Sequence, residues 1–259
     1  MKAKKSFGQH FLNNEDIASS IANGLICNTS DQKVVEIGPG RGMLTKYLID
    51  RGFDLKVVEL DRDMIPILHH IFEQLQDRIL EVDFLKLDLQ EVFEGQPFML
   101  IGNYPYNISS QIVFKMIENR NLIPQMVGMF QKEVAQRIVA TPTSKAYGVI
   151  SVLTQAYYDG EYLLDVGNEN FDPPPKVQSG VIRLTRKAED HVIEHPKLFK
   201  SIVKLAFSQR RKMLRNTMKS LLSDTEILQD KFFTQRPERI SVEKFIWLSN
   251  VVAEHNKNK

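Results

Sequence analysis

The chain has 259 residues, of which 42% are hydrophobic and 25% charged, as is ordinary for a soluble globular protein of one or two domains. No apolar stretch approaches the ~20 residues that a membrane helix needs, and no apolar region follows the basic N-terminus as it would in a secretory signal. A single cysteine, Cys27, excludes an internal disulfide framework and favours a reducing compartment, so we expect a cytoplasmic protein. The formal net charge of +2 does not by itself indicate a class of partner.

The first two thirds of the chain alternate short apolar runs with amphipathic stretches. The runs predict buried strands at Lys33–Ile37, Leu55–Leu60, Ile79–Val82, Phe98–Gly102 and Met126–Gln131. The stretches between them predict helices at Thr45–Arg51, Arg62–Gln76, Ser109–Arg120 and Lys132–Thr141. This alternation is typical of an α/β protein with an open, mostly parallel, Rossmann-like sheet.

The last third changes from this alternation to a helical pattern. A helix is predicted at Tyr147–Tyr158, followed by a pair of strands at Tyr162–Val166 and Ser179–Thr185. The polar segment Arg186–His195 marks the predicted domain boundary, and Pro196 and Ser241 are expected to start helices beyond it. We therefore predict a first domain over 1–186 and a small α-helical domain over 187–259.

A glycine-rich turn follows the first predicted strand, with the sequence Glu36-Ile37-Gly38-Pro39-Gly40-Arg41-Gly42. Gly38 and Gly40 let the backbone turn tightly and approach a ligand closely, although simple tight turns and dehydrogenases use glycines in the same way. Glu59 lies about 20 residues beyond, where an acid hydrogen-bonds ribose hydroxyls, whereas Asp61 is better placed to cap the next helix. Asp83, at the end of the third strand, is a candidate acceptor for an adenine amine.

Asn103-Tyr104-Pro105-Tyr106 follows the fourth strand. The amide oxygen of Asn103 and the backbone carbonyl of Tyr104 are suited to accept both hydrogens of an adenine 6-amino group. Pro105 restricts the backbone that carries this carbonyl, and Tyr106 offers an aromatic face on which an extruded base can stack. The alternative is a proline turn after a buried strand.

The combination of these features favours one class of enzyme. A glycine turn, two acids at strand ends and Asn-x-Pro-Tyr match a methyltransferase that uses S-adenosyl-L-methionine to modify an amine. A dehydrogenase needs no Asn-x-Pro-Tyr, and a P-loop is excluded because no Gly-Lys-Ser/Thr follows the turn. No metal-ligand cluster stands near the motif, so no metal is expected.

A run of basic residues without any acid extends from Lys197 to Lys219. Its members are Lys197, Lys200, Lys204, Arg210, Arg211, Lys212, Arg215 and Lys219. A solvated helix face is the plain explanation, but such a face normally interleaves acids that form i,i+4 pairs. The run therefore favours a nucleic-acid interface, with Lys204, Arg210, Arg211, Lys212 and Arg215 as candidate RNA-binding residues.

Several of these motifs together resemble the rRNA adenine dimethyltransferases, in particular the small-subunit (16S) branch, KsgA/RsmA. The resemblance covers nearly the whole chain. It is carried by Lys5–Leu12, Val35–Gly40, Val58–Asp61, Asn103–Ile108, Gln131–Val134, Ser144–Gly148, Phe171–Val177 and Phe207–Lys212. It implies a class I methyltransferase domain with a small helical C-terminal domain.

The resemblance also implies an activity and a set of site residues. Members of the family transfer two methyl groups to each of two adjacent adenosines in a hairpin loop near the 3′ end of 16S rRNA, in the small ribosomal subunit or its precursor. The cofactor contacts implied for this chain are His10, Leu12, Gly38, Gly40, Glu59, Asp83 and Asn103. Members often have Asn at the position of His10 and Leu or Ile at that of Tyr104, so the Tyr104 side chain is expected to serve packing.

One further site residue and three competing functions remain open at this stage. Phe171 is expected to stack on the target base opposite Tyr106, or else to be a core aromatic that anchors the proline-rich loop. The nearest rival function is a large-subunit (23S) rRNA adenine methyltransferase that confers antibiotic resistance. The others are a non-catalytic ribosome-assembly factor and a DNA adenine methyltransferase, for which no target-recognition region is found. A monomer is expected.

Overall fold

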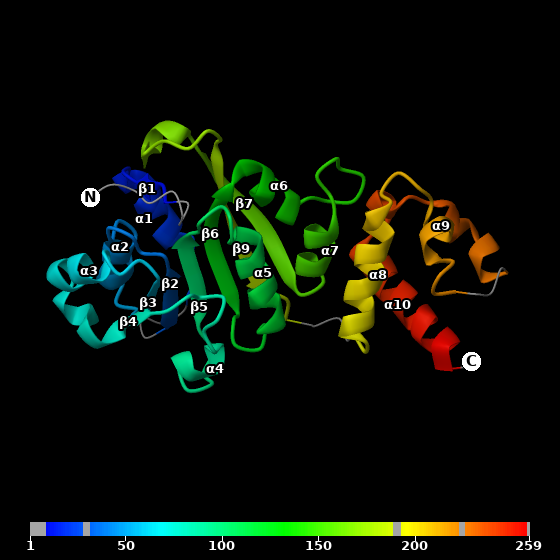
Figure 1. Ribbon diagram of the computed structural model, residues 1–259, viewed down its shortest axis with the longest axis horizontal. Coiled ribbons are helices and arrows are strands. Elements are labelled where there is room, and N and C mark those ends of the chain that lie inside the picture. Colours follow the sequence, from blue (N-terminus) through cyan, green and yellow to red (C-terminus); the bar gives the residue numbers. More distant parts are fainter. Residues whose placement is uncertain (1–8, 28–31, 189–192, 223–225, 258–259) are drawn as a thin grey trace. The chain divides into compact units, whose positions relative to one another are not determined.

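The structure is a computed structural model. It describes residues 9–27, 32–188, 193–222 and 226–257, which form two compact units (Figure 1). The first unit contains 1–136 and 159–186, and the second contains 137–158 and 187–259. The chain thus leaves the first unit after Arg186, where the sequence placed the domain boundary, but residues 137–158 group with the second unit. No helix within the described ranges combines the length and apolarity needed to cross a membrane.

The first unit is built on a seven-stranded mixed sheet, which confirms the predicted α/β, Rossmann-like fold. Its strands lie in the order β4 (Ile79–Glu81), β3 (Asp54–Glu59), β2 (Lys33–Ile37), β5 (Met99–Asn103), β6 (Gln125–Gln131), β9 (Ser179–Arg186) and β7 (Tyr158–Val166). The first five strands pair in parallel, and β9 pairs antiparallel with β6. The predicted strands agree with these bounds to within a residue, except that β7 begins four residues earlier than expected.

The strand order creates the place where a ligand can bind. From β2 the chain moves outward to β3 and β4 and then returns to β5 on the other side of β2. Ligands of such sheets bind outside the carboxyl ends of the strands at this reversal. Gly38 follows β2 and Asn103 ends β5, so the fold brings the glycine turn and the Asn-x-Pro-Tyr motif to the same edge.

Helices connect the strands of the first unit. They are α1 (Glu15–Asn23), α2 (Thr45–Asp50), α3 (Ile65–Ile71), α4 (Leu89–Val92), α5 (Ser109–Glu118) and α6 (Lys132–Ile138), with 3-10 helices η2 (Glu73–Arg78) and η3 (Asn168–Asn170). The helix predicted at Arg62–Gln76 is divided between α3 and η2, because Phe72 leaves helical geometry at φ −126° and ψ 80°. A Cβ at Gly42 would lie 2.3 Å from the Phe72 ring, so this break places the ring against the glycine turn.

A second, two-stranded sheet joins distant parts of the first unit. β1 (Phe11–Leu12) pairs antiparallel with β8 (Phe171–Asp172), with Leu12 opposite Phe171. The Arg41 guanidinium lies 4.4 Å from the Phe11 ring centroid and 3.3 Å from an Asp172 carboxylate oxygen. The N-terminal segment is therefore held against both the glycine turn and the proline-rich loop.

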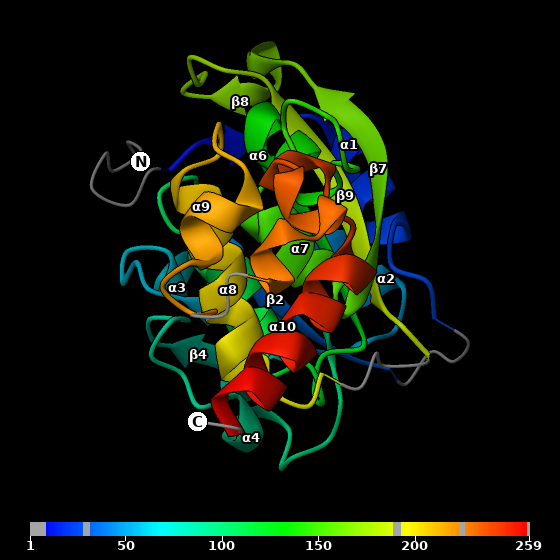
Figure 2. The same ribbon diagram turned by 90° about the vertical axis from the view of Figure 1, so that its right-hand side faces the viewer.

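The second unit is helical, as expected for the C-terminal part of the chain (Figure 2). It contains α7 (Val149–Gln155), α8 (Pro196–Ser208), α9 (Leu214–Met218) and α10 (Val242–Lys257), with 3-10 helices η4 (Ile227–Gln229), η5 (Lys231–Thr234) and η6 (Pro237–Arg239). α8 packs against α7, α9 and α10. Phe207 is part of this helical core. Its ring meets Tyr147 edge to face at a centroid distance of 6.1 Å and also contacts Phe245.

The Tyr104 side chain is buried in the first unit, where it serves packing. It is 1% exposed, its ring meets Phe130 edge to face at 5.1 Å, and its hydroxyl donates to the carbonyl of Val127 at 3.2 Å. Gly128 on β6 makes room for the ring, since a Cβ there would lie 2.0 Å from a ring carbon of Tyr104. The glycine and the tyrosine are therefore complementary in size.

We expect Gly128→Ala to lower the free energy of unfolding by about 1–3 kcal/mol, because the new methyl group overpacks the core against Tyr104. Combining it with Tyr104→Leu removes the ring that the methyl group would meet. The double variant should consequently lose less stability than the sum of the two single variants, as urea denaturation of all four proteins will measure. Strictly additive losses would contradict the proposed complementarity.

Candidate active site

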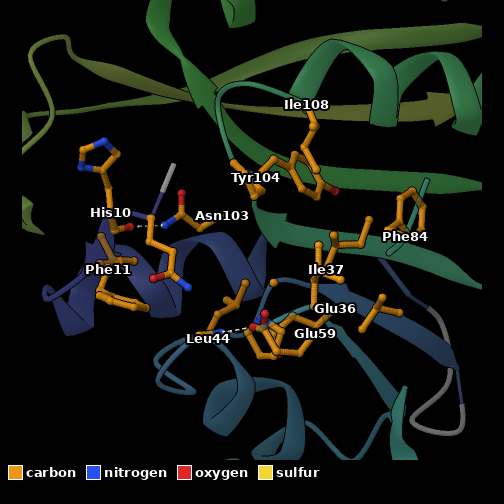
Figure 3. Close-up of a pocket in the computed structure, with 18 of the residues that line it drawn as sticks. His10, Phe11, Glu36, Ile37, Leu44, Glu59, Phe84, Asn103, Tyr104 and Ile108 are labelled. Atoms are coloured by element: carbon orange, nitrogen blue, oxygen red, sulfur yellow. Dashed lines mark hydrogen bonds between the residues drawn. The ribbon is translucent and has the colours of Figure 1, made fainter. Parts of the chain in front are cut away.

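A pocket of about 340 Å³ opens at the carboxyl ends of β2, β3 and β5 (Figure 3). Apart from Phe171, every residue that the sequence proposed for the catalytic or cofactor site lines it: His10, Leu12, Gly38, Gly40, Glu59, Asp83, Asn103, Tyr104, Pro105 and Tyr106. Much of the remaining wall is apolar and includes Ile37, Leu44, Leu60, Val82, Phe84, Leu85 and Ile108. An apolar cleft with a few converging polar groups is the usual form of a small-molecule site.

The glycine turn adopts a backbone that favours glycine and leaves space at the pocket wall. Gly38 has φ +67° and Gly40 has φ +55°, in the left-handed region that residues with a side chain rarely occupy. A Cβ at Gly38 would meet no heavy atom within 4 Å, so the space beside this residue is open to a ligand. At Gly40 a Cβ would lie 3.0 Å from the Phe11 ring, so this glycine allows β1 to approach the turn.

The Glu59 carboxylate is held in place at the end of β3. Oε1 accepts from the backbone N–H of Asp61 at 2.8 Å, and Oε2 accepts from that of Gly40 at 3.2 Å. Burial raises the pKa of Glu59, while the backbone N–H groups around it oppose that shift. Each carboxylate oxygen can accept further hydrogen bonds, so the group is suited to bind the two hydroxyls of a ribose.

Asp61 does not share this role. It acts instead as a cap, in agreement with the expectation from the sequence. It is 1% exposed, its Oδ1 accepts from the N–H of Asp63 at 3.1 Å, and its Oδ2 accepts from the side-chain amide of Gln9 at 2.8 Å. Asp61 therefore caps the turn that leads into α3 and fixes the segment just before β1.

Asp83 shapes the loop after β4. Its Oδ1 accepts from the backbone N–H of Leu85 at 2.9 Å. The Lys115 ammonium, from α5, donates to the carbonyls of Leu85 and Leu87 at 3.0 and 2.6 Å. The loop that carries Asp83 and Phe84 into the pocket is thus supported from a neighbouring helix.

A buried acid in the pocket wall, Glu36, was not assigned a role from the sequence. It is 1% exposed, and Oε2 accepts from the Thr45 hydroxyl at 2.7 Å. Burial raises the pKa of Glu36 to about 8, and the nearby charge of Glu59 acts in the same direction. The signal in the sequence is a carboxylic acid inside an otherwise apolar strand, which burial tends to keep protonated.

Asn103 lies at the end of β5 with its amide orientation fixed. Its side-chain N–H group donates to the backbone carbonyl of His10 at 2.9 Å (Figure 3). Among the described residues, the amide oxygen of Asn103 has no hydrogen-bond partner. The hydrogen bond to His10 therefore leaves this oxygen ready to accept from a ligand amine.

Tyr106 is anchored through its hydroxyl and contacts one other ring. The hydroxyl shares a 2.7 Å hydrogen bond with that of Ser179, and the ring stacks with the His10 imidazole at a centroid distance of 5.5 Å and an interplanar angle of 28°. Partial burial raises the pKa of Tyr106. The phenol therefore stays neutral at physiological pH.

Phe171 is the sequence-proposed site residue that the pocket does not contain. It is 3% exposed, pairs with Leu12 through β8 and β1, and belongs to the hydrophobic core. In this structure Phe171 is therefore a core aromatic that anchors the proline-rich loop, which is the alternative given for it, and its stacking on a base stays a prediction.

The candidate RNA-binding residues all belong to the second unit. Lys204, Arg211, Lys212 and Arg215 are exposed. Arg210 is only partly exposed, donates to the carbonyl of Ser144 at 3.3 Å and lies 3.9 Å from a carboxylate oxygen of Glu238. Arg210 thus has a packing role within its own unit that the other four do not share. In the described part of the chain, no group of three or more acidic, histidine or cysteine side chains could hold a metal ion.

A model of the family described as ribosomal RNA adenine dimethylase matches residues 1–249. The chain belongs to this family. A member from Bacteroides fragilis, named ribosomal RNA small subunit methyltransferase A, is 50% identical over 255 residues, which cover 98% of this chain and 93% of that protein. Membership in the ribosomal RNA adenine dimethylase family implies the use of S-adenosyl-L-methionine as methyl donor.

Two solved structures agree with the fold of this ribosomal RNA adenine dimethylase. The structure of a dimethyladenosine transferase from Plasmodium falciparum has a TM-score of 0.77 at 24% identity and covers 96% of this chain and 98% of that chain. The structure of the 23S rRNA methyltransferase ErmE has a TM-score of 0.70 at 24% identity, over 93% and 99% of the two chains. Both confirm the fold, and at this identity neither decides the substrate.

The raised pKa of Glu36 predicts a pH dependence of stability. An unfolded chain releases this proton near pH 4.5 and the folded protein near pH 8, so the folded state binds the proton more tightly. Stability should therefore fall as pH rises from about 4.5 to about 8. In Glu36→Gln, which cannot titrate, urea denaturation should show a flatter pH profile, and the variant should gain stability relative to the unmodified protein as pH rises.

Glu73→Gln is the matched control, because Glu73 is exposed outside the pocket. This control should follow the profile of the unmodified protein. The interpretation fails if Glu36→Gln shows the same pH dependence as the unmodified protein between pH 4.5 and 8.

Proposed function

We propose that this protein dimethylates the 6-amino groups of two adjacent adenosines in a hairpin loop near the 3′ end of 16S rRNA, with S-adenosyl-L-methionine as methyl donor. The observation that carries the proposal is an Asn103 amide oxygen held free at the pocket wall in a chain that is 50% identical to a small-subunit methyltransferase. The substrate would be the small ribosomal subunit or its precursor, and the role would be in ribosome biogenesis.

The shape of the pocket and the hydrogen-bond acceptors in its wall support the use of this cofactor. Gly38 leaves open space at the wall, and the Glu59 carboxylate is positioned to accept from the ribose hydroxyls. Asp83 would accept from the adenine amine of the cofactor, while Leu12 and Gly40 contribute wall contacts. When bound, S-adenosyl-L-methionine would supply an electrophilic methyl group, whose bond to the sulfonium sulfur would break as the bond to the amine nitrogen forms, with a neutral thioether as the leaving group.

The target amine would be held by Asn103 and the backbone of Tyr104. Their two oxygens accept its hydrogens and draw the nitrogen toward tetrahedral geometry, which frees its lone pair for in-line attack. Pro105 restricts the backbone that carries the Tyr104 carbonyl, and Tyr106 stacks on the extruded base. Positioning and hydrogen bonding account for the catalysis, and the methylated amine loses its proton to water.

The helical unit would bind RNA through exposed cations. Lys204, Arg211, Lys212 and Arg215 lie within 12 residues of chain without an acid between them, so each can approach a phosphate without pairing internally. Arg210 would contribute less, because Glu238 already lies beside it. The single cysteine and a ribosomal substrate favour a cytoplasmic location away from membranes, and a monomer remains the expected state.

The first test measures transfer of labelled methyl groups from S-adenosyl-L-methionine to small subunits that lack dimethyladenosine, with protein-free large-subunit rRNA in parallel. Mass spectrometry should locate dimethyladenosine at two adjacent small-subunit positions. Label only in large-subunit rRNA would instead support the hypothesis of a 23S rRNA methyltransferase that confers antibiotic resistance. Tight RNA binding without any label would support a non-catalytic ribosome-assembly factor.

We expect Asn103→Ala to lower the turnover number by about a hundredfold or more, because it removes the preorganised acceptor for the target amine. The fold should be retained, as thermal unfolding will report. Asn23→Ala, on the exposed surface of α1, is the matched control and should keep full activity. Turnover close to that of the unmodified protein in Asn103→Ala would exclude the proposed role.

Neutralising three exposed cations of the helical unit, in Arg211→Gln/Lys212→Gln/Arg215→Gln, should weaken RNA binding and its salt dependence. Affinity falls as salt rises, and each lost phosphate contact makes the slope of log affinity against log salt less steep by about 0.7–0.9. The control Lys231→Gln/Lys244→Gln/Lys257→Gln removes the same charge from exposed positions outside the cluster. If both triple variants show the same slope as the unmodified protein, the cluster is a solvated helix face.

A further inference from the structure

We propose that Lys115 on α5 is a positioning residue for the adenine of the cofactor, and that it acts through the loop that carries Asp83. Lys115 is not among the residues that line the pocket. Its ammonium instead contacts the loop from which Asp83 and Phe84 enter the pocket wall (Figure 3). This inference rests on the proposed function, because it assigns a role toward the cofactor that the enzyme would use.

The loop after β4 receives little support from the sheet. β4 has three residues and stands at the end of the strand order, where it pairs with β3. Four consecutive residues after it nevertheless line the pocket: Val82, Asp83, Phe84 and Leu85. The position of the Asp83 carboxylate therefore depends on contacts from outside the sheet.

The loop turns tightly around Asp83. Oδ1 of Asp83 accepts from the backbone N–H of Leu85 at 2.9 Å, and the Asp83 carbonyl accepts from that of Leu87 at 3.1 Å. Among the described residues, Oδ2 of Asp83 has no hydrogen-bond partner. One carboxylate oxygen thus shapes the turn, and the other is left to accept from the adenine amine.

Lys115 holds the same two leucines from the other side. Its ammonium donates to the carbonyl of Leu85 at 3.0 Å and to that of Leu87 at 2.6 Å, and it lies 5.4 Å from the centroid of the Phe84 ring. Hydrogen bonds from a charged donor are stronger than those between neutral groups. Leu85 and Leu87 therefore link the Lys115 ammonium to the Asp83 carboxylate.

Removal of the ammonium should loosen this link. The carbonyls of Leu85 and Leu87 would lose their donor, and the turn that fixes Asp83 would lose its anchor on α5. Cofactor binding should then weaken at the adenine, while the methyl group and the target amine meet residues at the end of β5. The expected signature is a change in cofactor affinity with little change in the turnover number at saturating cofactor.

A second lysine provides a matched control. The Lys56 ammonium donates to the carbonyl of Val92 at 2.6 Å and lies 4.8 Å from the centroid of the Phe93 ring. The two kinds of contact are the same, but neither Val92 nor Phe93 lines the pocket. Methionine in place of either lysine keeps the apolar stem and removes the donors, so an effect common to both variants would be structural.

The test measures affinity for S-adenosyl-L-homocysteine by calorimetry, without methyl transfer. In Lys115→Met the Kd should rise at least about tenfold, the effect of one lost hydrogen bond of the cofactor amine to the Asp83 carboxylate. Lys56→Met should stay within about twofold of the unmodified protein. Lys115→Arg should recover most of the affinity, because a guanidinium also offers several donors. In activity assays, Lys115→Met should raise KM for S-adenosyl-L-methionine and leave kcat within about twofold.

A modified ligand shows whether the effect reaches the adenine amine. In the purine analogue of S-adenosyl-L-homocysteine, hydrogen replaces the 6-amino group, so Asp83 has no amine to accept from. The loss of affinity in Lys115→Met should be at least about threefold smaller for this analogue, because Lys115 and the amine act through the same carboxylate. In the ligand-free variant, hydrogen exchange at the amides of Leu85 and Leu87 should be faster than in the unmodified protein.

Three results would overturn the inference. They are equal weakening in Lys115→Met and Lys56→Met, equal weakening of both ligands in Lys115→Met, and an unmodified protein that does not bind S-adenosyl-L-homocysteine. The last result would also contradict the proposed function. Binding of this ligand without methylation of small subunits would contradict the proposed function alone, since the affinities would still decide the role of Lys115.

Discussion

The site depends on one hydrogen bond, from the side-chain amide of Asn103 to the backbone carbonyl of His10. An amide that can rotate offers a ligand either its oxygen or its N–H group, and only the oxygen can accept from an amine. Because the carbonyl takes the N–H group, the oxygen is left for the ligand. The orientation of the group at the end of β5 is therefore determined by a segment more than 90 residues earlier in the chain.

This hydrogen bond gives the short strands β1 and β8 their importance in the first unit. β1 is only two residues long, yet it places His10 beside Asn103 and Phe11 against the glycine turn. β8, on the other side, carries the loop whose Pro173 carbonyl accepts from His10. The sheet supplies the floor of the pocket with Glu59 and Asn103, and β1, which pairs with β8, supplies the wall at Phe11 and Leu12.

Much of this could be predicted from the sequence, and the failures have physical reasons. The parallel strands were predictable because buried parallel strands are continuous apolar runs, and their carboxyl ends meet at one edge, which brings Gly38, Glu59 and Asn103 together. The pairing of β1 with β8 has no local signal, so the sequence left open whether Phe171 stacks on a base or lies in the core. The raised pKa of Glu36 and the fit of Tyr104 against Gly128 depend on neighbours that no local pattern reveals.

The pairing of β1 with β8 also has a consequence for the synthesis of the protein. The two strands are about 160 residues apart in the chain, so β1 is synthesised long before its partner β8. At elongation rates of about 5–20 residues per second, that interval lasts at least several seconds. During this time the five parallel strands are already available for pairing, whereas β1, which follows His10, still lacks its partner β8. The nascent chain can therefore form the parallel part of its sheet before the segment that orients Asn103 is held in place.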